Sequence, residues 1–340
     1  MNKTKSFLFL LLFFSTVCTV TVAQEVIINE RLESLNFLDQ LPEEILSTKT
    51  VVIVKTLNDQ QTGIRPEWKS VASVVQKGMA KSGIDAVAYY HFDDLLSGYE
   101  SYHAFLDAFD GRDIKHAAFL LTDGSFYRLI LLKLTDRQFL IQQNQNAWKI
   151  DGKDLSSMME DVYRKAANSK IESTNLLIIE TPEFGEMVHV IQKRRSDFYD
   201  LNFASETLAI PQFADSSEIA KVMLDYPYKW KIVPLGSDEK ELRSQGLQYV
   251  LYYCHSTVES VRSLLEYPLG ENQSAYVSEV IENGQTQVTT HTLNTNVYKF
   301  YIKHIYTQNV FIGKKWDPAK TWPQALKNYI YNMRHELIRN

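Results

Sequence analysis

The chain has 340 residues and a formal net charge of −5, and this length suggests about two domains, each with its own core. Its mild acidity argues against a general nucleic-acid binder, because such proteins carry a basic face. Glycine (13) and proline (9) are too sparse for a disordered or repetitive chain. We therefore expect an α/β (α+β) protein with two mixed-sheet domains whose helices pack on the sheets.

The first 23 residues have the three parts of a secretory signal peptide. Lys3 and Lys5 form a positive start, and residues 7–14 are all Phe or Leu. Thr21-Val22-Ala23 then offers a cleavage site before Gln24. A spanning helix needs about 20 apolar residues, and Ser and Thr dilute this segment, so we expect cleavage rather than a retained anchor. Cleavage would change the net charge from −5 to −7 and leave no transmembrane span. The predicted location is the periplasm or the outer membrane.

Neither of the two cysteines is expected to form a disulfide bond. Cys18 lies in the predicted signal peptide, and Ser15-Thr16-Val17 before it is a poor lipidation motif, so we do not expect a lipid anchor there. Cys254 then remains alone, and an exported protein with one cysteine has no internal disulfide. Its stability must come from burial of apolar side chains.

Residues 24–48 predict a helical lead-in that is broken at Pro42, and residues 49–170 predict the first α/β domain. Continuous apolar runs of strand length alternate there with amphipathic helical patterns. The last of these helices has Asp154 in position to cap it. Strands are predicted at residues 50–55, 86–90, 116–121, 127–134 and 139–143, with a short one at 147–150, and helices at 66–82, 95–109 and 155–166.

Residues 171–340 predict a second α/β domain with a β-hairpin insertion. The hairpin covers residues 277–290 around Asn283-Gly284, the strongest two-residue hairpin signal. Pro323 opens the final amphipathic helix. The other predicted strands are at residues 176–179, 208–210, 230–233, 248–253, 298–303 and 310–312, and the other helices at 216–224 and 238–244.

The two domains share an order of predicted elements that ends in a run of strands and a closing helix. The segments 149–154 and 312–317, just before those closing helices, also look alike. These features predict a tandem duplication with a hairpin added to the second copy. The alternative is that any two α/β domains share such an order.

The segments 51–55, 71–83, 117–121, 127–134 and 155–166 carry a resemblance to a known unit. They resemble the amino-terminal domain of TolB and, more loosely, the periplasmic domain of CsgG-type envelope proteins. The resemblance covers most of the first half, more faintly the second, and includes no diagnostic motif. It implies envelope assembly work, in which the domain docks proteins rather than transforms substrates.

The best polar cluster is His91, Asp93 and Asp94, with His103 further along. It follows a predicted strand, where α/β sheets place ligand sites, and imidazole with carboxylates could hold a divalent metal. The interpretation we favour is that Asp93 or Asp94 caps the next helix, because a carboxylate accepts its free amide hydrogens. Phosphate-loop, dinucleotide, zinc-protease and nucleophile-elbow motifs are absent from the sequence.

Two further features lie in the second half. Cys254 and His255 are neighbours on a predicted strand and should point to opposite faces, so we interpret Cys254 as a small buried side chain. Tyrosine and tryptophan are frequent there and should mostly fill the core, but we expect a surface patch near Trp316 and Trp322 that binds a partner.

These observations predict an exported, non-enzymatic binding or assembly factor with an envelope protein partner and no cofactor. One alternative is a metal-dependent hydrolase that uses the His91 cluster. Another is a small-ligand receptor that binds between the two domains.

Overall fold

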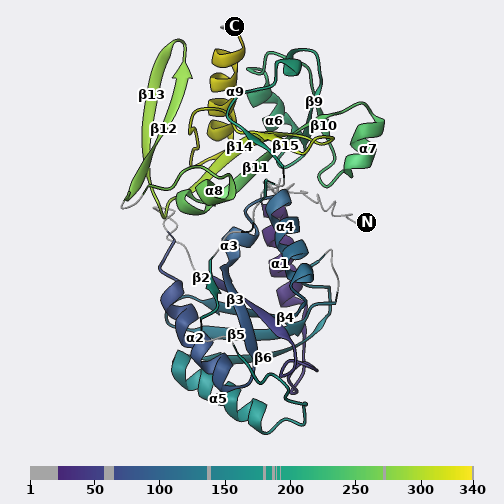
Figure 1. The fold of residues 1–340 in the computed structure, drawn as a ribbon, viewed down its shortest axis with the longest axis vertical. Helices are drawn as coiled ribbons and strands as arrows, with labels where there is room; N and C mark the ends of the chain where they lie inside the picture. Colours follow the sequence, from purple (N-terminus) through teal and green to yellow (C-terminus); the bar gives the residue numbers. More distant parts are fainter. Residues whose placement is uncertain are drawn as a thin grey trace, which may run out of the picture.

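The computed structural model describes residues 22–56, 65–135, 139–178, 181–185, 188, 190–191, 193–270 and 273–338. The predicted signal peptide lies outside these residues except for its last two positions, which belong to helix α1 (Val22–Glu33). The chain forms an α/β fold with two large mixed sheets, as predicted (Figure 1). None of the described helices is long and apolar enough to cross a membrane.

The first sheet has parallel strands in its centre and antiparallel strands beside them. Its order is β1-β6-β5-β4-β2-β3-β7, and β2 runs parallel to both β3 and β4. Its strands are β1 (Asn36–Phe37), β2 (Lys49–Thr56), β3 (Asp85–His91), β4 (Ile114–Thr122), β5 (Tyr127–Lys133), β6 (Asn146–Gly152) and β7 (Glu183–Phe184).

Helices cover both faces of this sheet. Helices α2 (Lys69–Lys81) and α5 (Leu155–Ala167) bury Val75, Met79 and Val162 against one face. Helices α1, α3 (Phe92–Leu95) and α4 (Tyr99–Gly111) bury Ile28 and Phe105 against the other. The sheet is therefore the middle layer of three, because its central strands are apolar on both faces.

The second sheet has the order β10-β9-β11-β14-β15-β8. Its strands are β8 (Arg195–Ser196), β9 (Leu208–Pro211), β10 (Trp230–Val233), β11 (Tyr249–Thr257), β14 (Asn296–His304) and β15 (Asn309–Phe311). Helices α6 (Ser216–Met223) and α9 (Trp322–Ile338) pack on one face, and α7 (Glu239–Ser244) and α8 (Val258–Leu264) pack on the other. A 3-10 turn, η1 (Leu201–Ala204), precedes β9.

The two sheets have the same topology over six strands. The order β1-β6-β5-β4-β2-β3 in the first matches β8-β15-β14-β11-β9-β10 in the second, and each neighbouring pair has the same relative direction. The short turn between β4 and β5 corresponds to the long excursion between β11 and β14. That excursion contains α8 and the hairpin of β12 (Ala275–Glu282) and β13 (Gln285–Thr292). Such a match is what a tandem duplication would leave, and the duplication itself stays a prediction.

Two strand predictions were wrong. Residues 139–143 form an irregular segment with a bend at Leu140 and Ile141, although both side chains are buried, and the strand that follows is the longer β6. Of the strand predicted at residues 176–179, residues 176–178 lie outside regular structure, and residue 179 lies outside the described residues. Leu176 and Leu177 are almost fully exposed. A short apolar run does not by itself specify a strand, because contacts with distant parts of the chain decide whether it pairs.

The two halves meet where α3 and the start of α4 lie against β11. The backbone N–H of His255 donates to the carbonyl oxygen of Ser97 at 2.5 Å. Glu100 on α4 pairs with Lys303 on β14, also at 2.5 Å. Gly98 passes so close to β11 that any Cβ atom there would overlap a backbone carbonyl oxygen. The carboxyl end of β3 leads directly into α3 and so into this contact region (Figure 1).

Candidate functional site

The imidazole of His91 is fully buried and caps helix α3. Its Nδ1 accepts a hydrogen bond from the backbone N–H of Asp93 at 3.2 Å. Its Nε2 lies 2.9 Å from the hydroxyl of Thr56 on β2, so the neutral tautomer that donates from Nε2 satisfies both contacts. Burial, followed by the nearby Arg65 cation, lowers the pKa of His91 to about 4. The histidine is therefore neutral at physiological pH.

This cap corrects the sequence-based prediction for the start of α3. The side chain that accepts the free amide hydrogen is that of His91, not that of Asp93 or Asp94. Both aspartates lie in the first turn, where negative charge is favourable for the helix dipole. His103, which follows in the sequence, lies on α4 and packs against the ring of Tyr99.

Asp94 belongs to a buried polar network that joins the two halves. Its Oδ1 lies 2.8 Å from Nη1 of Arg65 and accepts a hydrogen bond of 2.6 Å from the hydroxyl of Ser256. The same hydroxyl accepts from Nη2 of Arg65 at 2.8 Å. Burial alone would raise the pKa of Asp94, but Arg65 and the other donors hold it below its usual value. Asp94 is therefore an ionised structural group.

The metal-site alternative requires His91, Asp93 and Asp94 to converge on one ion. Among the residues that the structure describes, no group of three or more His, Cys, Asp or Glu side chains is arranged to hold a metal. Instead, His91 faces Thr56, and Asp94 faces Arg65 and Ser256.

Cys254 is a buried, free thiol, as expected. Burial raises its pKa to about 12, so the thiolate needed for nucleophilic attack is not formed near neutral pH. The ring of His255 stacks on Tyr298 with a centroid distance of 3.9 Å.

Trp316 and Trp322 do not form the surface patch that the sequence predicted, because both side chains are buried. Their side chains are only 8% and 7% exposed. Trp322 packs edge-on against Phe213, and Trp316 packs against Tyr267 and the guanidinium of Arg262. Both indoles therefore belong to the core of the second half, and a direct role in partner contact stays an untested prediction.

The hairpin of β12 and β13 is the part of the second half that stands away from the main sheet (Figure 1). Asn283 and Gly284 have positive φ angles of 50° and 79°, as a type I′ turn requires. All of β13 except His291 is exposed, whereas Ser278 and Val280 of β12 are buried. The hairpin is therefore attached to the body through β12.

The outer edge of β12 is covered by the body of the second half. The backbone N–H of Glu279 donates to the carbonyl oxygen of Trp316 at 2.7 Å. The N–H of Ile281 donates to the side-chain oxygen of Asn332 at 3.0 Å, and the Asn332 amide donates back to the carbonyl of Glu279 at 2.9 Å. These bonds satisfy the edge of β12 that faces away from β13.

The outer edge of β13 has no such cover within the described part of the chain, where β12 is its only paired strand. Residues of an antiparallel pair alternate between hydrogen-bonded and non-hydrogen-bonded pairs. Thr286 and Val288 lie opposite Ile281 and Glu279, whose N–H groups point outward, so they belong to the non-hydrogen-bonded pairs, as does Thr290. The N–H and C=O groups of Thr286, Val288 and Thr290 therefore point to the free edge.

This edge lacks the features that usually prevent edge-to-edge pairing. Natural edge strands are blocked by Lys, Pro, bulges or short length. β13 has eight residues, pairs with β12 without a register shift, and carries neither Lys, Arg, Asp, Glu nor Pro. The sequence pattern predicted the hairpin but not its free edge. The feature that could have indicated this edge is the composition of the second strand, which is rich in Thr and lacks Lys, Arg, Asp and Glu.

Comparison with known protein families, characterised proteins and solved structures found no match to this chain.

Proposed function

We propose that the protein is a non-enzymatic binding factor of the cell envelope that takes up an extended segment of a partner protein along β13. The observation that supports this is the free edge of β13 with its outward backbone groups at Thr286, Val288 and Thr290. An incoming strand would pair with these groups by β-augmentation, in which main-chain hydrogen bonds supply affinity. Each such bond contributes about 0.5–1.5 kcal/mol net.

The composition of β13 indicates the chemistry of the partner segment. The strand carries no Asp, Glu, Lys or Arg, and its one histidine, His291, is buried, so a charged partner would lose hydration without gaining an ion pair. Val288 on β13 is 65% exposed, and Val277 on β12 is 48% exposed. A neutral segment rich in β-branched residues would extend this surface, because such side chains pack well across neighbouring strands.

The envelope location rests on the predicted signal peptide, and the TolB-like resemblance of the first half is in keeping with a docking role. We regard the first half and the second sheet as the rigid support of the hairpin. The ion pair of Lys315 with Glu279, at 2.6 Å, helps to anchor β12 to this support.

The test is a single proline on the free edge. Thr290→Pro removes an outward N–H and places a ring in the path of an incoming strand, while the hairpin ladder to β12 keeps its bonds. Thr290→Val is the matched control, because it keeps the N–H and the β-branched shape. Each variant is exported in its native host, crosslinked mildly and recovered from membranes, and its partners are identified by mass spectrometry.

A partner segment bound along the edge should be recovered with the wild type and Thr290→Val but lost with Thr290→Pro. Hydrogen exchange should then show slower exchange at the amides of Thr286, Val288 and Thr290 when the purified partner is added. Equal recovery by all three proteins would refute the proposal. If the wild type were a dimer in light scattering and Thr290→Pro a monomer, the occupant of the edge would be a second copy instead.

A further inference from the structure

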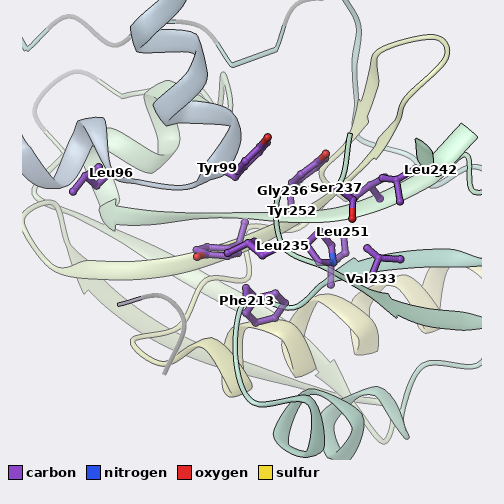
Figure 2. Close-up of a pocket in the computed structure, with 13 residues that line it drawn as sticks. Leu96, Tyr99, Phe213, Val233, Leu235, Gly236, Ser237, Leu242, Leu251 and Tyr252 are labelled. Atoms are coloured by element: carbon purple, nitrogen blue, oxygen red, sulfur yellow. The ribbon is translucent and has the colours of Figure 1, made fainter. Parts of the chain in front are cut away.

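A separate small cavity lies between the two halves. Its walls come mainly from the second half, and Leu96 and Tyr99 of the first half reach it from the start of α4 and the turn before it (Figure 2). Phe213, Val233 and Leu251 provide apolar surface. The cavity is independent of the β13 edge, because no residue of the hairpin lines it.

Its position follows from the strand order of the second sheet. β9 ends at Pro211 and β10 at Val233, whereas β11 pairs with β9 only at Tyr249 and Val250 and then continues alone on that side. In the sheet, β10 is the neighbour of β9 on one side and β11 is its neighbour on the other side, so the strand order reverses at β9. Open α/β sheets bind ligands in the crevice at the carboxyl ends of strands where the order reverses in this way.

The polar groups at the cavity are hydroxyls. Tyr99, Tyr252 and Ser237 line it. Ser237 already donates to the carbonyl oxygen of Pro234, whereas the Tyr99 and Tyr252 hydroxyls have no hydrogen-bond partner within the described residues. An apolar cavity with a few convergent polar groups is the usual form of a small-molecule site.

The charges around Tyr99 select against anions. Burial raises its pKa, and three carboxylates raise it further, those of Glu100, Asp238 and Glu239. The ammonium of Lys303 acts in the opposite direction and pairs with Glu100 and Glu239, and Arg243 also pairs with Glu239, so two cations face three carboxylates. The surroundings are therefore net negative, so an anionic ligand would be repelled.

One wall of the cavity is the 234–238 loop, which belongs to no strand. Gly236 has a φ of +77°, a left-handed conformation that favours glycine, and this turn brings the loop beside the ring of Tyr99. Leu235 in the same loop is 40% exposed. The cavity now measures about 40 Å³, whereas sites for drug-sized ligands measure roughly 300–1,000 Å³. A six-membered ring is larger than this space, so binding requires the 234–238 loop to shift outward.

We infer that this cavity is a binding site for a small, uncharged aromatic alcohol, which lies between Tyr99 and the 234–238 loop and joins the two halves. The ring would lie against Val233 and Leu242, which belong to the same apolar cluster as Tyr252, and its hydroxyl would pair with that of Tyr99 or Tyr252. Because both halves contribute to the site, bound ligand stabilises their contact.

The probe for this site is p-cresol, and its matched anion is 4-methylbenzoate. The full chain is titrated with each by calorimetry and by thermal unfolding. We expect saturable binding of p-cresol with a rise in Tm, and binding of the benzoate at least about tenfold weaker, a difference of about 1.4 kcal/mol. Tyr99→Ala should weaken p-cresol binding about tenfold or more.

Tyr163→Ala is the control, because Tyr163 is a half-exposed tyrosine on α5 that does not line the cavity. If Tyr99→Ala does not fold, Leu235→Ala tests the mouth of the cavity at an exposed position. Equal affinity for both probes, equal losses in Tyr99→Ala and Tyr163→Ala, or no saturable p-cresol binding would each overturn the inference.

Discussion

The ammonium of Lys299 on β14 lies 2.8 Å from Oδ1 of Asp317, and neither side chain reaches solvent. Burial lowers the pKa of Lys299 and raises that of Asp317, and the attraction between the two groups opposes both shifts. Asn332 also donates to Oδ2 of Asp317 at 3.0 Å. Asp317 lies five residues before α9, whereas Asp154 directly precedes α5 and caps it. The aspartates that precede the two closing helices therefore have different structural roles.

Removing one member of this pair should be far more costly than removing both. Lys299→Met leaves a carboxylate buried without its cation, and we expect a loss of about 3–5 kcal/mol in the free energy of unfolding. The double variant Lys299→Met/Asp317→Leu should recover most of that loss. Urea unfolding of the wild type, both single variants and the double variant completes the cycle. Additive losses would show that the two charges do not interact.

Gly98 should be essential for the contact between the halves. A Cβ atom there would overlap the carbonyl oxygen of Tyr253, a backbone atom that cannot rotate away. We expect Gly98→Ala to lower the free energy of unfolding by about 1–3 kcal/mol. The control is Gly111→Ala at the end of α4, where a Cβ atom meets nothing within 4 Å. That change should be neutral or slightly stabilising, because alanine is the better helix former. Equal thermal unfolding of the two variants would contradict this view of the interface.

Local sequence patterns predicted much of the fold. The apolar run of β2 and the Asn283-Gly284 turn are short-range signals, and both elements are present. Failures came where long-range contacts decide the outcome. Leu140 and Ile141 have the composition of a strand and are buried, yet β5 pairs with β6 instead.

The candidate sites were harder to predict than the fold, for the same reason. The sequence placed Trp316 and Trp322 near one another but could not show that Arg262 and Phe213 would cover them. The edge of β13 is free only because no distant strand pairs with it in the described chain. The cavity at Tyr99 is lined by residues from both halves, and the spacing of these residues along the sequence does not show that they lie close together.

His116 should make stability depend on pH. It is fully buried, its Nδ1 lies 2.8 Å from the hydroxyl of Thr48, and its Nε2 lies 2.9 Å from the carbonyl oxygen of Glu43. Burial, the largest cause, lowers its pKa to about 4. The unfolded chain, with a pKa near 6.5, therefore binds a proton first as the pH falls. The stabilisation is present above about pH 6.5 and is lost as the pH falls toward 4.

From pH 7 to pH 5, this one group should cost the wild type about 2 kcal/mol of unfolding free energy. His116→Gln cannot titrate, so its stability should change less over the same interval, even if it is lower at pH 7. Urea titrations at both pH values measure the difference. His91 and His255, each with a pKa lowered to about 4 chiefly by burial, add the same trend to both proteins and so cancel in the comparison. Parallel losses in the wild type and the variant would exclude the role of His116.

Ser256 should couple the unfolding of the two halves. Its hydroxyl donates to Asp94 and accepts from Arg65, so Ser256→Ala leaves two buried charged groups each short of one partner. We expect a loss of about 1–3 kcal/mol. Because Asp94 and Arg65 belong to the first half and Ser256 to the second, the loss should weaken the contact between them. Calorimetry should then resolve two transitions in Ser256→Ala where the wild type shows one. Ser244→Ala, at an exposed serine of α7, is the control, and a single unshifted transition in both variants would show that the network does not join the halves.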